Sequence, residues 1–290
     1  MSYIKIRHLK SSNHSHSIQP YRRRSDLPNP CPGLAVLFNH NYINVKNQDE
    51  KIPFWTWAFA LVDCYNFSTP FALFFALISA WRFKLFSYRF SVRDLATHGS
   101  IEHDASMTRH DFGKGDFISA DLNLINRMLN ALSKNRTKRL QNHSKIQINS
   151  SINHDTVTLE DFVNHKIDLQ NQLKTYTAQS KWNVKFLGAG HVAFTLQALQ
   201  LPQSLCHQDG IMTYQSWLKV WFEEERLPLD LGWRKPTCQT TALSTFNLVH
   251  KNLMIQKGSP DQTISDSLFS FIKEIGNLFN IQTKKDSIHS

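Results

Sequence analysis

Hydrophobic positions along the chain recur mainly at the spacing of helices. Leu34, Leu37 and Phe38 fall on one side of a helix predicted over residues 33–42. Leu122, Ile125, Met128, Leu129 and Leu132 mark an amphipathic helix in the same way. Further helices are predicted near residues 159–175, 186–200 and 211–225. The pattern therefore favours an all-α fold.

Three polar or terminal stretches bound this helical region. Residues 1–25 are polar and basic and predict a disordered arm; without an apolar core they do not resemble a secretory signal, so we expect an intracellular protein. Residues 134–153 are rich in Lys and Arg and predict a surface loop. Residues 241–290 form a C-terminal extension, in which helical spacing over 264–279 predicts one more helix.

Residues 53–82 are strongly aromatic, from Phe54 to Trp81. Asp63 and Asn66 interrupt the apolar run, and the stretch after Pro70 is too short to span a bilayer. We therefore expect no transmembrane segment here, but buried helices that line a hydrophobic pocket. Weak contact with a membrane surface is the alternative.

Composition is that of a folded domain with a basic surface. The 290 residues are 41% hydrophobic, and the formal net charge is +10. The basic residues are spread over both tails and the 134–139 region, and no recognition helix, zinc finger or RNA-binding signature is present. Phosphate-binding loops and Gly-x-Ser-x-Gly motifs are also missing. We expect no nucleic-acid partner.

The turn Asn29-Pro30-Cys31-Pro32-Gly33 places a cysteine where the first predicted helix begins. Proline suits the first helical position, so Cys31 is predicted to be the N-cap. Backbone N–H groups from about Gly33 and Leu34, with the helix dipole, would face its sulfur and lower the pKa of the thiol. Such a thiolate suits an axial ligand of haem iron. An ordinary thiol in a Pro-rich turn and a transient haem-regulatory Cys-Pro site fit the same residues.

The segment Glu102-His103-Asp104-Ala105-Ser106 suggests a site for a divalent cation. If a helix runs through it, Glu102 and Ser106 are i,i+4 neighbours and can place two oxygens on one hard cation. The carbonyl of His103 would add a third oxygen. Alternatively, Glu102 and Asp104 are solvated acids in the first turn of a helix.

Four blocks in this order resemble the fungal haem-thiolate peroxidases, which include chloroperoxidase and the unspecific peroxygenases. They are Pro30-Cys31-Pro32-Gly33-Leu34 with Asn39-His40, the Glu102–Ser106 segment with Arg109 and Asp111, Thr158-Leu159-Glu160-Asp161, and Glu225-Arg226-Leu227-Pro228 with Leu231-Gly232-Trp233-Arg234. The resemblance implies one haloperoxidase-like helical domain over residues 26–240.

The resemblance also implies a set of roles. Cys31 would bind the iron of haem b, and Glu102, His103 and Ser106 would bind Mg²⁺ or Mn²⁺ beside a haem propionate. His103 would lie on the distal side of the haem, held by Asp104, and pair with a glutamate of a later helix that moves the peroxide proton.

The helix expected to supply that glutamate reads Phe186-Leu187-Gly188-Ala189-Gly190-His191, which places His191 at the position of the acid. An imidazole can accept a proton and return it, so His191 is a candidate catalytic residue with His103 and Asp104. We expect its use to favour neutral over strongly acidic pH, with both imidazoles charged below about pH 4. A hydrogen-bonded core histidine is the alternative.

The expected function is oxidation of a small, lipophilic organic substrate by hydrogen peroxide. One-electron peroxidation, oxygen insertion and halide oxidation all agree with the resemblance. Because the expected glutamate is replaced, two other functions stay open: a non-catalytic haem carrier or sensor, and a haem enzyme that works without peroxide.

Overall fold

The computed structural model describes residues 20–82, 88–96, 103–143, 155–172, 178–202 and 210–258. Over these residues the chain is mostly helical, as predicted. The elements in chain order are α1 Pro32–Asn39, β1 Ile52–Pro53, α2 Phe54–Tyr65, α3 Thr69–Arg82, β2 Arg89–Phe90, α4 Val92–Leu95, α5 Leu122–His143, β3 Thr156–Thr158, α6 Leu159–Gln172, α7 Ala178–Ala198, β4 Met212–Tyr214, α8 Gln215–Glu223, a 3₁₀ turn Leu229–Leu231 and α9 Ala242–Lys257.

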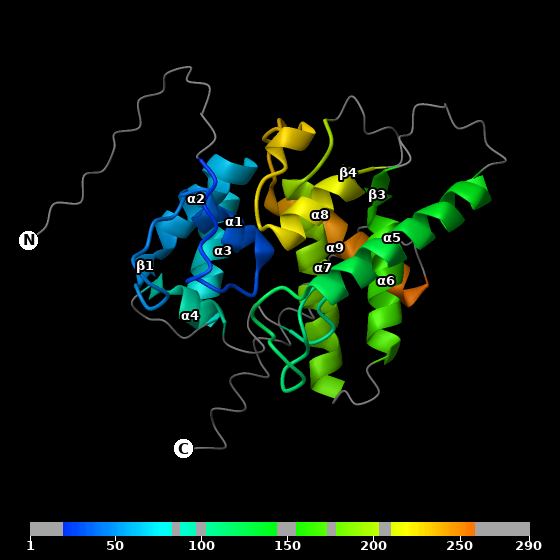
Figure 1. Cartoon of the computed structure of the whole chain (residues 1–290), viewed down its shortest axis with the longest axis horizontal. Coiled ribbons are helices and arrows are strands. Elements are labelled where there is room, and N and C mark those ends of the chain that lie inside the picture. Colours follow the sequence, from blue (N-terminus) through cyan, green and yellow to red (C-terminus); the bar gives the residue numbers. More distant parts are fainter. Residues whose placement is uncertain are drawn as a thin grey trace, which may run out of the picture.

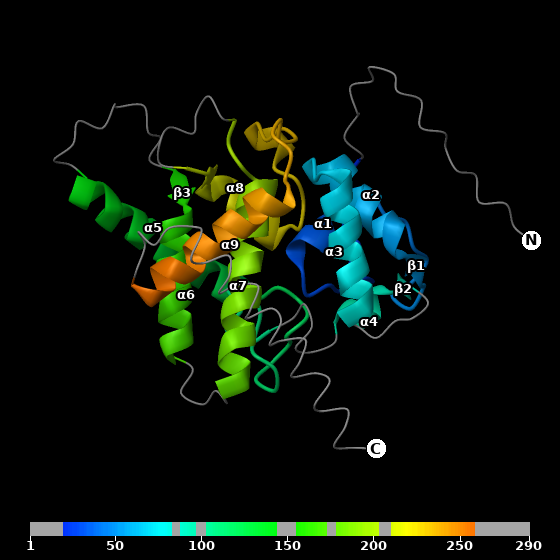
Figure 2. The same ribbon diagram turned by 180° about the vertical axis from the view of Figure 1, so that it is seen from behind.

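The helices form two groups that lie side by side. Helices α1 to α4 lie together with the small antiparallel β1–β2 pair, and α5 to α9 form the other group with the antiparallel β3–β4 pair (Figure 1). The same division is visible from behind (Figure 2). Each strand pair lies at the start of a helix: β1 leads directly into α2, and β3 leads directly into α6.

Tyr65, at the end of α2, joins the two groups. Its ring is fully buried and lies 5.4 Å from that of Phe194 in α7 and 5.6 Å from that of Trp221 in α8, between ring centroids. Its hydroxyl donates to the backbone carbonyl of Gly33 in α1, at 2.5 Å. A single buried side chain therefore fixes the start of α1 against α7 and α8.

The aromatic region forms two helices, α2 and α3, that pack on each other, and the inner side chains are buried. We expected these helices to line a hydrophobic pocket. For the pocket described below this is wrong, since no described residue of either helix lines it. The inner faces of the two helices are used in packing instead. Five apolar side chains remain on the outer faces: Trp55, Phe59, Phe74, Phe75 and Leu77. Contact with a membrane surface stays a prediction. No described helix has the length and apolar character needed to cross a membrane.

Helix α5 corrects the prediction of a surface loop for residues 134–143; residues 144–153 of that prediction lie outside the described residues. The helix continues to His143, and two basic residues of this stretch have partners on neighbouring elements. Arg139 pairs with the buried carboxylate of Asp161 (Nη2 to Oδ2, 3.1 Å), and Arg136 donates to the side chain of Gln215 at 3.1 Å. Lys and Arg are good helix formers, so their number did not indicate a loop.

The terminal regions are described in part. Residues 1–19, which hold most of the predicted arm, lie outside the described residues, and an intracellular location stays a prediction. A helix does form in the C-terminal extension, but it is α9, at residues 242–257; the predicted helix over 264–279 lies outside the described residues. Val249 and Leu253 of α9 pack on Ala189 and Ala193 of α7.

Candidate active site

Cys31 is the N-cap of α1, as predicted, with Pro32 at the first helical position. Its backbone is extended (φ −107°, ψ 114°), and its carbonyl accepts from the N–H groups of Leu34 and Ala35 at 3.1 and 3.0 Å. Its own N–H donates to the side-chain oxygen of Asn29 at 3.0 Å. The cysteine is thus held from both sides in a rigid turn.

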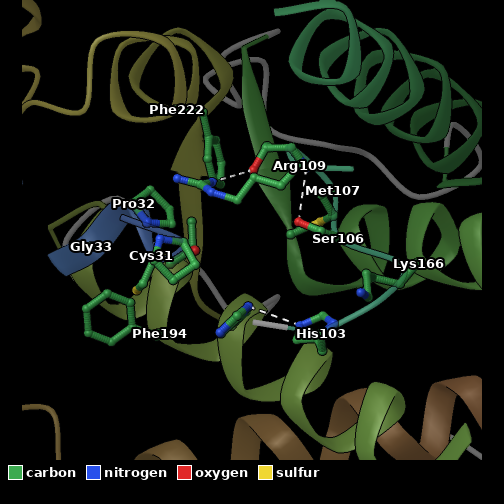
Figure 3. Close-up of a pocket in the computed structure, with 14 residues that line it drawn as sticks. Cys31, Pro32, Gly33, His103, Ser106, Met107, Arg109, Lys166, Phe194 and Phe222 are labelled. Carbon is green, nitrogen blue, oxygen red and sulfur yellow. Dashed lines mark hydrogen bonds between the residues drawn. The ribbon is translucent and has the colours of Figure 1, made fainter. Parts of the chain in front are cut away.

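Cys31 lies in the wall of a pocket between the two groups of helices. The pocket is bounded by α1, by the loop 103–109, by Lys166 of α6, by α7 and by Phe222 of α8 (Figure 3). Two of the predicted site residues, His103 and Ser106, come from the loop, and His191 comes from α7. Residues distant in sequence therefore meet at one cavity.

The environment of the thiol only partly agrees with prediction. Burial raises the pKa of the Cys31 thiol, and this effect outweighs the N–H of Leu34, the charge of Arg109 and the N–H of Gly33, which all lower it. The two predicted donors are present, but the net lowering of the pKa that we expected from them is wrong, because burial disfavours the charged thiolate by more than they favour it.

The two histidines form a hydrogen-bonded pair. His103 Nε2 lies 3.2 Å from His191 Nδ1, and His103 Nδ1 lies 2.7 Å from the backbone carbonyl of Asp104. Asp104 thus contacts His103 through its main chain, while its carboxylate accepts from the N–H of Phe112 at 3.0 Å. The carbonyl can only accept, so Nδ1 of His103 carries the proton. When Nε2 of His103 is unprotonated, it accepts from Nδ1 of His191, which leaves Nε2 of His191 with a free lone pair.

The surroundings of His191 favour its neutral form. Burial lowers the pKa of His191 to about 3, and the positive charges of Lys166 and Arg109 act in the same direction. The imidazole is therefore neutral at physiological pH. Once protonated, it would be a strong acid that gives the proton back readily.

The segment expected to bind a divalent cation is not a helix. Residues 103–106 are irregular, with a bend at 104–105, and Ala105 has a left-handed backbone (φ 58°). The backbone is held there because the N–H of Ala105 donates to Asp111 Oδ1 at 2.7 Å and its carbonyl accepts from Lys166 Nζ at 2.6 Å. The helix that would have aligned Glu102 with Ser106 was thus predicted wrongly. Glu102 itself lies outside the described residues, and no group of three His, Cys, Asp or Glu able to hold a metal occurs among those described.

Arg109 ties the loop to the cysteine turn. Its guanidinium is buried and donates to the carbonyl of Asn29 at 3.0 Å, to that of Ile118 at 2.9 Å and to the hydroxyl of Thr108 at 2.9 Å. It also pairs with Glu225 at 3.3 Å. Asn29 in turn accepts from the N–H of Cys31, so Arg109 positions the cysteine through one intervening residue.

Comparison with known families shows to which family the chain belongs. Residues 18–238 match the family model described as Peroxidase, family 2, which covers well over half of the 290 residues. The chain belongs to peroxidase family 2. This confirms the resemblance found in the sequence, and membership of family 2 implies a haem-thiolate cofactor and peroxidase chemistry. No curated protein matches the chain.

The residues of this family 2 peroxidase suit haem by their chemistry. Cys31 places a thiol at the pocket wall, and the two charged residues of the described lining, Arg109 and Lys166, are both cationic. No acidic side chain lines the pocket among the described residues. A positive pocket with one thiol suits an iron cofactor that carries carboxylates. Cys31 would hold the iron.

Sequence reasoning missed Lys166 as a pocket residue of this family 2 peroxidase. The side chain is 1% exposed, and burial lowers its pKa to about 8, against the attraction of Asp111. Lys166 follows the core residues Phe162 and Val163 at helical spacing, so it occupies an apolar position of α6. A lysine at such a position was the signal in the sequence.

Proposed function

We propose that this family 2 peroxidase oxidises a small, lipophilic organic substrate with hydrogen peroxide, with haem b held by Cys31 and with His191 handling the peroxide proton. The observation that carries the proposal is the contact between His103 and His191 in a pocket that also contains Cys31. Bound haem would supply the oxidising chemistry. The protein must supply the ligand, the proton transfer and the pocket.

His191 is the proton acceptor in this proposal. Its Nε2 has a free lone pair when Nδ1 donates to His103, and the ring lines the pocket. After taking the first peroxide proton at Nε2, the ring is an imidazolium whose Nδ1 proton still bonds to His103. It then gives the Nε2 proton to the departing oxygen. His103 and the carbonyl of Asp104 keep the ring orientation fixed during both steps.

The pocket also supports His191 as the replacement for the family glutamate. A carboxylate elsewhere in the lining would offer another proton acceptor, but the described lining has none. Thr195 is one helical turn after His191 on α7 and lines the same pocket. The register that places His191 in the pocket is therefore shared by the next turn of the helix.

The test is a spectrum followed by an assay. The protein is expressed with haem supplied. One sample is reduced and exposed to carbon monoxide for the spectrum. A second sample, kept in the ferric form, receives peroxide and a phenolic donor for the assay. We expect a red-shifted, thiolate-type Soret band with turnover of the donor. The same band without turnover would favour a haem carrier or sensor, and turnover of a substrate without peroxide would favour a peroxide-independent enzyme. Well-folded protein that takes up no haem would contradict the proposal.

Two finer parts of the proposal have separate tests. Binding of Mg²⁺ or Mn²⁺ by Glu102, His103 and Ser106 is measured by metal analysis of the purified holoprotein, before and after dialysis against a chelator. The reaction type is measured by supplying an alkane-bearing substrate, a phenol and chloride or bromide in separate assays. The products distinguish oxygen insertion, one-electron peroxidation and halide oxidation.

A further inference from the structure

Lys166 presents a buried positive charge to the pocket. Its ammonium nitrogen lies 2.6 Å from the carbonyl of Ala105, and Figure 3 shows that nitrogen at the edge of the pocket near His103. An ammonium group can donate three hydrogen bonds, and only this one is formed with the described residues. No described carboxylate lies within ion-pair distance of it.

Burying such a charge raises the free energy of the folded protein, so a purely structural role does not account for it. A buried ion that lacks an oppositely charged partner destabilises the folded chain, because removing an ion from water has a large free-energy cost. The fold nevertheless keeps space for it. A Cβ atom at Gly188 of α7 would lie 2.7 Å from both Cε and Nζ of Lys166, so a side chain there would displace the ammonium.

The other charges near the pocket already have partners. Arg109 pairs with Glu225 and donates to two carbonyls and a hydroxyl, so four of its five N–H groups are engaged. Asp111 accepts from the N–H of Ala105 and from Lys114, at 2.7 and 2.9 Å. Of the two charged residues in the described pocket lining, Lys166 is thus the one without a carboxylate partner, and two of its three N–H groups are unused.

We propose that Lys166 binds a carboxylate of the anionic cofactor that occupies this pocket. The inference rests on the proposed function, because haem b carries two carboxylates, and it names the residue of this chain that neutralises one of them. A carboxylate at Nζ would accept one or both of the unused N–H groups and supply the missing opposite charge. The cost of burying the ammonium in the empty protein is then offset when the cofactor binds.

The test compares ferric haem with its dimethyl ester, which has no carboxylates. Dissociation constants of both are measured by absorbance titration of haem-free wild-type protein, Lys166→Met, Lys166→Gln and the control Lys114→Met, all in the same detergent. Lys114 is an exposed lysine on the neighbouring loop. Ratios between variants cancel the different solubility of acid and ester. We expect Lys166→Met and Lys166→Gln to reduce the preference for the acid by about 10-fold or more, as for loss of a charged hydrogen bond. Lys114→Met should keep it.

The two Lys166 variants separate charge from structure. Gln keeps an N–H donor, one bond nearer the backbone than that of Lys, but carries no charge, so a wild-type preference in Lys166→Gln would overturn the proposal. An unchanged preference in both variants would also overturn it while the proposed function stands. If folded wild-type protein binds neither compound, the proposed function fails together with this inference. Thermal melts of each haem-free variant show whether it is folded, and a folded Lys166→Gln suffices for the decision.

Discussion

Nε2 of His103 lies 3.2 Å from Nδ1 of His191, and this contact fixes which nitrogen of His191 can act as a base. We predict that His191→Phe lowers the rate of peroxide-dependent oxidation by about 10²- to 10⁴-fold, the usual contribution of a positioned acid–base group. Haem uptake and the thiolate spectrum should be retained, because Cys31 is not touched. The control is His250→Phe, a change of another buried histidine, on α9 and outside the pocket lining. An unchanged rate in His191→Phe would remove His191 from the mechanism.

The pH profile is a second prediction. Burial, Lys166 and Arg109 lower the pKa of His191 to about 3, so the base stays unprotonated well below pH 5. The sequence alone led us to expect both imidazoles to be charged below about pH 4, and for His191 that is wrong, because burial disfavours its charged form. We expect kcat to be nearly constant from pH 7 to about 4.5 and to fall as the pH approaches 3. Stopped-flow assays with brief exposure to acid measure this, and a rate that keeps climbing below pH 4 would contradict it.

Cys31→Ala is the third prediction. The change removes the sulfur from the pocket wall, so the red-shifted band of the reduced carbon monoxide complex should disappear. Cys238→Ala is the matched control, since Cys238 is another free, partly buried cysteine outside this pocket. Its spectrum should equal that of the wild type. A thiolate band that survives in Cys31→Ala would exclude Cys31 as the ligand.

The parts of the fold that sequence predicted are those in which local pattern and burial agree. Residues Pro30 to Gly33 determine an N-cap by proline geometry alone, and the structure has it there. The helices predicted near 159–175 and 186–200 are also present, as α6 and α7, although α7 begins at Ala178, eight residues before the predicted start. Such features depend on neighbours in sequence, so the chain shows them without a structure.

The parts that could not be predicted depend on partners far along the chain. In the helix of residues 134–143, Arg139 and Arg136 are held by Asp161 and Gln215. Ala105 takes a left-handed backbone because Asp111 and Lys166 hold its N–H and carbonyl. None of these contacts can be recognised from the local sequence. The unexpected rise in the pKa of Cys31 has the same origin, since burial comes from elements that fold over it.

The fourth prediction concerns stability at low pH. His165 is 3% exposed, and burial, with the charges of Lys166 and Arg127, lowers its pKa to about 4. Between about pH 6.5 and 4 the unfolded chain binds this proton and the folded chain does not, so stability falls as the pH falls through this window. The group contributes up to about 3 kcal/mol of the loss.

Urea denaturation at several pH values measures the effect. His165→Leu should flatten the decline of unfolding free energy between pH 6.5 and 4 by about 1 kcal/mol per pH unit. Between pH 7 and 8, where the imidazole is neutral in both states, the difference between variant and wild type should stay constant. Parallel curves over the whole range would show that His165 titrates normally in the folded protein.

The last prediction concerns the contact between Gly33 and Phe194 beside Cys31. A Cβ atom at Gly33 would lie 2.2 Å from Cε1 of Phe194, which is far too close. The ring cannot swing away freely, since it packs against Tyr65 and Phe67, with centroids 5.4 and 5.6 Å apart. Gly33→Ala should therefore destabilise the haem-free protein by about 1–3 kcal/mol, as overpacking does.

A second substitution and a control separate this clash from a general effect of replacing glycine. Gly33→Ala combined with Phe194→Leu should recover part of the loss, because the smaller side chain leaves room for the new methyl group. Gly190→Ala is the control: it lies in α7 with nothing within 4 Å of an added Cβ, so it should be neutral or stabilising by up to about 1 kcal/mol. Thermal melts measure all four proteins. Equal effects of Gly33→Ala and Gly190→Ala would show that Phe194 does not press on the start of α1, and the turn that carries Cys31 would then owe its position to Asn29 and Tyr65 instead.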